Sequence, residues 1–198
     1  MEENILSAIL SRLDSNALQA IGRQTGASPD QTRAALASAI PILMNALAKN
    51  SSSAEGASAL QNAINRDHDG SLLDNLGGFL TNPAAANGAG ILRHILGDRQ
   101  QNVVNYISSD SGLNSSAVIR ILEIAAPIVM GFLGKKNSTG GGGIIGSILN
   151  SYLRAETKQA PQAQSVIDQI LDRDNDGNVK DDIAELGMSF LGRLLRKG

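Results

Sequence analysis

The fold is decided by the stretch ALASAIPILMNALAKN, residues 35–50, in which apolar side chains recur at the spacing of an α-helix. One stripe of this helix is formed by Leu36, Ile40, Leu43 and Leu47. Pro41 lies inside the stripe and removes one backbone donor, which predicts a kink. We therefore expect a long, kinked helix from Pro29 to about Lys49.

Capping signals define where this helix begins. Ser28 can cap its first turn, Pro29 suits the first helical position, and Gln31 completes a capping box. Gly26 predicts the end of a short helix before it. That helix carries Leu18 and Ile21, and an amphipathic first helix carries Ile5, Leu6, Ile9, Leu10 and Leu13.

The same pattern returns in the second half of the chain. Residues 121–136 read ILEIAAPIVMGFLGKK, so Pro127 stands 86 residues after Pro41. At this offset Gly26 also matches Gly112 and Met44 matches Met130. Because helical periodicity alone does not reproduce stops and prolines in register, we predict an all-α fold of two tandem helical repeats. They span residues 1–86 and 87–198 and meet at a Gly/Ala/Asn-rich linker predicted over residues 81–90.

Each predicted repeat ends in a loop of the Asp-x-Asp-x-Asp-Gly class. The second loop follows an apolar helical pattern and reads DRDNDGNVKDD, residues 172–182. In calcium loops of the EF-hand type, oxygen ligands come from positions 1, 3, 5 and 7, and a glycine at position 6 permits the turn. We predict a calcium site formed by Asp172, Asp174, Asp176, Asn178, Asp181 and Asp182. Ile183 replaces the acidic residue expected at position 12, so the site departs from a regular EF-hand.

The first loop is a weaker copy of the second. Its candidate ligands are Asn65, Asp67, Asp69, Ser71 and Asp74, with Gly70 at the turn position. Three carboxylates and a neutral residue at position 1 predict a lower affinity for calcium than in the second loop. The alternative for both loops is that Asp and Asn side chains form Asx-turns and helix caps without a metal ion.

The second repeat also contains an insertion. It begins with four consecutive glycines, residues 140–143, and includes a short helix predicted over residues 148–153. The glycines lack the following Lys-Ser/Thr of a phosphate-binding loop, which argues against nucleotide binding.

Composition excludes several classes of function. The chain of 198 residues has no cysteine, so it forms neither a disulfide framework nor a cysteine-ligated zinc site. A net charge of -2 gives no general attraction to nucleic acid or anionic membranes. An acidic start without a basic, apolar leader predicts no signal peptide. The apolar run over residues 121–134 is shorter than the roughly 20 residues of a membrane span, so we expect a buried helix.

No constellation of residues predicts an enzyme. His68 occupies position 4 of the first loop, and His94 lies on an amphipathic helix. Neither stands near a serine or cysteine nucleophile motif. The helical pairs around Gly26 and Gly112 have helix-turn-helix length, but the long helices carry only Arg33 and Arg120 before their terminal lysines. DNA binding is therefore the alternative prediction rather than the leading one.

A family resemblance covers nearly the whole chain. Its residues are GILRHILG (residues 90–97), SGL (residues 111–113) and APIVMG (residues 126–131), which Leu133 and Gly134 follow. This set resembles the YidB-like bacterial proteins classed as a domain of unknown function, DUF937. The resemblance implies an all-helical bacterial protein, homeodomain-like in part, and it brings no established activity, substrate or catalytic residue.

These observations lead to one functional hypothesis. We predict a non-enzymatic, cytoplasmic protein whose acidic loops bind calcium structurally and fix the angle between their flanking helices. Small residues and apolar stripes would then support self-association or a protein partner, without a membrane.

Overall fold

The computed structural model describes residues 5–139, 145–159 and 161–172, and these residues form helices with no strand. The prediction of an all-α fold is confirmed. The α-helices are α1 (Ile5–Leu10), α2 (Ser15–Thr25), α3 (Pro29–Asn50), α4 (Ala54–Asp67), α5 (Ser71–Asp74), α6 (Leu76–Thr81), α7 (Gly88–Leu96), α8 (Gln100–Ser111), α9 (Ser115–Thr139), α10 (Ile145–Gln159) and α11 (Pro161–Asp172). Two short 3-10 helices, η1 (Pro83–Ala86) and η2 (Gly97–Arg99), precede α7 and α8.

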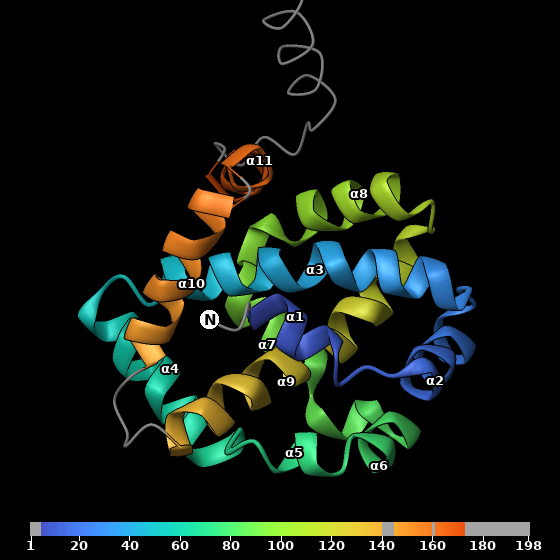
Figure 1. Ribbon diagram of the computed structural model, residues 1–198, viewed down its shortest axis with the longest axis horizontal. Coiled ribbons are helices and arrows are strands. Elements are labelled where there is room, and N and C mark those ends of the chain that lie inside the picture. The colour runs from blue at the N-terminus through green and yellow to red at the C-terminus, as the bar shows by residue number, and fades with distance from the viewer. Residues whose placement is uncertain (1–4, 140–144, 160, 173–198) are drawn as a thin grey trace, which may run out of the picture.

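The two long helices, α3 and α9, form the centre of the molecule and pack against each other (Figure 1). Every residue over 39–48 of α3 and over 124–134 of α9 is buried. Helices that are apolar on all sides are stable only when other helices surround them. The shorter helices therefore cover α3 and α9, and the buried side chains join into one hydrophobic core.

The predicted signals at helix ends are present. Ser28 and Gln31 form both hydrogen bonds of the capping box at the start of α3. Gly26 closes α2 with φ of 74°, and Gly112 closes α8 with φ of 69°, in the left-handed region that favours glycine. Both prolines, Pro41 and Pro127, lie inside helices that continue past them.

The helices that follow each long helix pack on the other one. After α3, the chain places α4 and α5 against α9. After α9, it places α10 and α11 against α3. The two halves therefore share their cores in this structure, while the division into repeats of residues 1–86 and 87–198 stays a prediction.

Two connecting segments contain more helix than the sequence predicted. Residues 81–90 are not an irregular linker, because α6 ends at Thr81, η1 follows, and α7 begins at Gly88. The helix predicted around residues 148–153 is confirmed as part of α10, which is longer than predicted and extends over Ile145–Gln159. The start of α7 has a tertiary cause: Pro127 cannot donate to the Glu123 carbonyl, and Gly88 packs directly against that carbonyl. A side chain at position 88 would prevent this approach.

One described helix, α9, is long and apolar enough to cross a membrane by length and composition alone. Of its most apolar window, 83% is buried inside the protein. This burial agrees with the prediction that the apolar run over residues 121–134 belongs to a buried helix.

Candidate functional site

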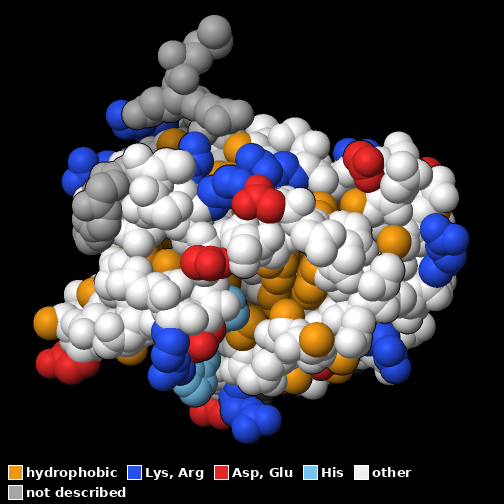
Figure 2. All heavy atoms as spheres, turned by 90° about the horizontal axis from the view of Figure 1, so that it is seen from below, with side chains coloured by type: hydrophobic (Ala, Val, Ile, Leu, Met, Phe, Trp, Pro, Cys, Tyr) orange, Lys and Arg blue, Asp and Glu red, His pale blue; other side chains and the backbone are white. Residues whose placement is uncertain are grey.

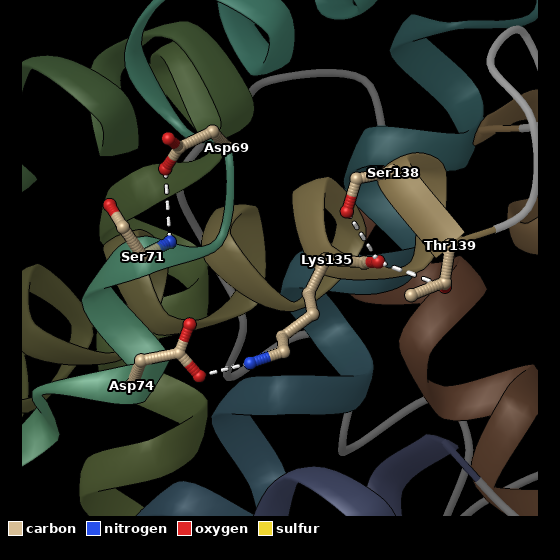
Figure 3. A network of polar contacts seen from close by, with 6 residues as sticks. All are labelled: Asp69, Ser71, Asp74, Lys135, Ser138 and Thr139. Atoms are coloured by element: carbon tan, nitrogen blue, oxygen red, sulfur yellow. Dashed lines mark hydrogen bonds and ion pairs between the residues drawn. The ribbon is translucent and has the colours of Figure 1, made fainter.

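The first acidic loop lies against the C-terminal end of α9 (Figure 3). Gly70 turns the chain with φ of 99° and packs on the backbone of Lys135, where an added Cβ would lie 2.8 Å from the Lys135 amide nitrogen. On the facing helix, an added Cβ at Gly134 would lie 2.9 Å from the carbonyl carbon of His68. The absence of both side chains lets the two backbones meet, so the loop is a packed element of the fold.

Asn65 and the three carboxylates of the first loop each interact with a different residue. Asn65 accepts hydrogen bonds from Gln61 at 3.0 Å and from Asn137 at 3.2 Å. Asp67 pairs with Arg66 at 2.9 Å, and Asp74 pairs with Lys135. Asp69 accepts a hydrogen bond of 2.9 Å from the backbone N–H of Ser71 in an Asx-turn. Across the residues that the structure describes, no group of three or more His, Asp or Glu side chains lies close together.

Local hydrogen bonds favour the charged forms of the loop's carboxylates. The backbone N–H of Ser71 lowers the pKa of Asp69, and the guanidinium of Arg66 lowers the pKa of Asp67. Burial lowers the pKa of the half-buried His68 imidazole, and the carboxylates of Asp67 and Asp69 oppose that shift. At neutral pH the loop therefore presents two exposed carboxylates on either side of a neutral histidine.

Lys135 is the residue of this site that sequence reasoning missed. It comes from α9, 61 residues beyond Asp74 in the chain, and its ammonium contacts the Asp74 carboxylate. In the sequence, Lys135 is only one of the terminal lysines of its own helix, where a positive charge complements the helix C-terminus. Because Lys135 is far from the acidic loop in the chain, no local sequence pattern indicates this contact.

We expect the Lys135–Asp74 pair to contribute modestly to stability. The side chains are 35% and 63% exposed, so solvent screens their attraction. Lys135→Met should lower the free energy of unfolding by less than about 1 kcal/mol in urea titrations at low salt. In a double-mutant cycle with Asp74→Asn, each substitution should lower the free energy of unfolding by less when the other is already present. Strict additivity of the two effects would contradict a direct interaction.

The second acidic loop lies outside the described residues, apart from its first position. Asp172 is the last residue of α11. The other candidate ligands, Asp174, Asp176, Asn178, Asp181 and Asp182, follow beyond it. The structure therefore shows how the helix leading to this loop is held, and the ligand set stays a prediction.

The helix α11 is anchored on the C-terminal half of α3. Gln164 donates a hydrogen bond of 2.6 Å to the side-chain oxygen of Asn45, and both residues are buried. Apolar side chains of α11 complete the contact, namely Ile167, Ile170 and Leu171. Nearby, burial lowers the pKa of Lys49, and the carboxylate of Asp168 opposes that shift. These contacts fix the position from which the second loop begins.

Two surface clefts flank the segment from η1 to α7. One, of about 410 Å³, lies between the first acidic loop, Ile91 and the Pro127 turn of α9. The other, of about 380 Å³, lies between α6, the start of α7, and the side chains of Arg120 and Glu123. His68 lines the first cleft, whereas His94 lines neither and is exposed on α7. The two histidines thus belong to different surroundings.

Comparison with known proteins identifies one family. The model of a bacterial protein family of unknown function, DUF937, matches residues 7–136, which include α3, most of α9 and the first acidic loop. No curated protein and no solved structure matches the chain. The resemblance found in the sequence is confirmed, and the family carries no established activity.

Proposed function

We propose that this chain, which belongs to the DUF937 family of bacterial proteins, is a non-enzymatic cytoplasmic protein with a structural or protein-interaction role. Its first acidic loop clamps the end of α9 without needing a metal ion. Its second acidic loop binds calcium and orders the segment after α11.

The observation that carries this proposal is how the first loop is held against α9. Gly70 and Gly134 bring the two backbones together, and Asp74 and Lys135 pair beside them. Asn137 donates a further hydrogen bond to Asn65. A loop with these contacts joins α4 and α5 to the opposite half of the molecule. A calcium ion at this loop would compete with Lys135 for the carboxylate of Asp74.

Calcium is assigned to the second loop because of its composition. Five carboxylates within residues 172–182 repel one another, and a hard dication relieves that repulsion by binding to their oxygens. The anchored helix α11 supports this assignment, since a helix fixed at its end lowers the entropy cost of ordering the loop that follows. We assign a structural role to calcium in this proposal. The first loop has a similar sequence pattern and connects α4 and α5 while it packs on α9.

Calcium is expected to raise the melting temperature of chelator-treated protein. When free calcium is tenfold above Kd, binding to the native state adds about 1.4 kcal/mol, or roughly 3–6 °C in Tm for a chain of this size. Asp174→Asn with Asp176→Asn should abolish both this shift and the heat of binding in calorimetry. The measurements are differential scanning calorimetry and isothermal titration up to about 1 mM calcium.

The matched control changes the same two positions of the first loop, Asp67→Asn with Asp69→Asn. Asparagine at position 69 can still accept the hydrogen bond of the Asx-turn, so the fold is retained. This variant should keep the full response to calcium. A wild-type protein that shows no response would remove calcium from the proposal, and a response lost only in the first-loop variant would reverse the assignment of the loops.

DNA binding stays the alternative from the sequence, and no specific observation favours it. Apart from Asn50, the exposed residues of α3 lie in its first turns, where Asp30 accompanies Arg33. Arg120 of α9 lies with Glu123 along one cleft, so its charge is also balanced. A shift of duplex DNA at low salt by the apo protein would revive this alternative.

A further inference from the structure

The cleft beside the first acidic loop combines an apolar floor with an acidic rim. Leu72, Ile91 and Pro127 line its apolar part, and Gly131 leaves space on the α9 side. An added Cβ at Gly131 meets nothing closer than 3.7 Å. Figure 2 looks onto this side of the molecule, where a hollow with hydrophobic side chains on its floor lies next to histidine and acidic side chains.

The charge of this cleft has one sign. Asp67 and Asp69 line it, and no lysine or arginine is among its lining residues. Arg66 pairs with Asp67 from outside the cleft, but its side chain is 82% exposed, and such surface pairs exchange partners at little cost. The neighbouring cleft differs because Arg120 and Glu123 balance each other there. An occupant of the first cleft should therefore carry apolar side chains together with positive charge.

We propose that this cleft binds the basic C-terminal segment, residues 190–198, of a second copy of the chain. Its apolar side chains are Phe190, Leu191, Leu194 and Leu195, and its charged side chains are Arg193, Arg196 and Lys197. Leucine side chains fit the apolar floor, and the guanidinium and ammonium groups fit the rim formed by Asp67 and Asp69. This inference rests on the protein-interaction role proposed above and gives it a site and a partner.

The position of the last described residues favours a second copy over the same chain. In Figure 1, α11 lies at the top and α5, beside the cleft, lies at the bottom, with α3 between them. Only 17 residues, 173–189, separate α11 from the segment, and they include the second acidic loop. Binding between copies requires no such crossing of the molecule. If each copy gives its segment to the other, the contacts close into a two-fold dimer.

Sedimentation velocity in chelator tests this inference without involving calcium, so its result is separate from the fate of the calcium assignment. The full chain should form a dimer at about 50 mM salt that weakens at about 300 mM salt. Charge reversal of the segment, Arg193→Glu with Arg196→Glu and Lys197→Glu, should raise the dimer Kd at least about tenfold. Deletion of residues 190–198 should leave a monomer.

Substitutions in the cleft provide the second half of the test. Asp67→Asn with Asp69→Asn, and separately Gly131→Leu to fill the floor, should each raise the dimer Kd at least about tenfold. Circular dichroism checks that each variant is folded. Glu123→Gln in the neighbouring cleft is the matched control and should leave Kd unchanged. A full chain that stays monomeric, or a dimer that survives either the deletion or the cleft substitutions, would overturn the inference.

Discussion

Replacing Gly134 with alanine is expected to lower the free energy of unfolding by about 2–4 kcal/mol. The new Cβ would overlap the carbonyl of His68 and lie 3.0 Å from the carbonyl carbon of Asp69. These are backbone atoms, so rotation of a side chain cannot relieve the overlap. The first loop must move away from α9, which also separates Asp74 from Lys135.

Gly131 gives a matched control in the same helix. An added Cβ there meets the Leu73 side chain at 3.7 Å, an ordinary van der Waals distance. Because alanine favours a helix over glycine by about 1 kcal/mol, Gly131→Ala should be neutral or stabilising. Urea unfolding followed by circular dichroism measures both variants. Equal stability of the two variants would show that the first loop does not need its close contact with α9.

The signals that sequence reasoning placed correctly are local ones. Ser28 and Gln31 form the predicted capping box because its hydrogen bonds join residues three apart. Gly26 ends its helix because the left-handed conformation is a property of the residue itself. The apolar stripe around Pro41 likewise predicted the central helix, since its periodicity is visible without any tertiary contact.

The connections between helices could not be predicted from local patterns. Residues 81–90 have the composition of a linker, yet Gly88 begins α7 because it packs on the Glu123 carbonyl of a distant helix. The first acidic loop has the spacing of a calcium loop, but Lys135 and Asn137 contact it from positions 61 and 72 residues away. A sequence motif is defined by the types and spacing of its own residues. It therefore cannot predict contacts with residues that are distant in the chain, such as Lys135 and Asn137.

The polar contact between α3 and α11 was also invisible in the sequence, and it decides how α11 is held. Asn45 and Gln164 are 119 residues apart and meet at 2.6 Å. Asn45 in turn donates a hydrogen bond of 2.9 Å to the Pro41 carbonyl. The side-chain oxygen of Gln164 is buried and has no hydrogen-bond partner among the described residues. The side-chain amide of Gln164 therefore already has a buried oxygen without a hydrogen bond. Its NH₂ group donates hydrogen bonds to Asn45 and Asp168.

Asn45→Ala is accordingly expected to lower the free energy of unfolding by about 2–3 kcal/mol, the second large effect. The substitution removes the nearer of the two acceptors of the Gln164 donor, leaving only Asp168, and it leaves a small cavity under α11. Replacing both residues by leucine should cost less than the single change, because no buried amide then lacks a partner.

The measurement is urea unfolding of Asn45→Ala, together with a double-mutant cycle of Asn45→Leu, Gln164→Leu and the combined variant. Asn62→Ala on the exposed side of α4 controls for loss of an asparagine side chain at a solvent-facing helical position and should change stability by less than about 0.5 kcal/mol. A double variant that costs as much as the two single changes together would show that Asn45 and Gln164 do not act as a unit. In that case the apolar contacts of Ile167, Ile170 and Leu171 would hold α11 on α3 by themselves.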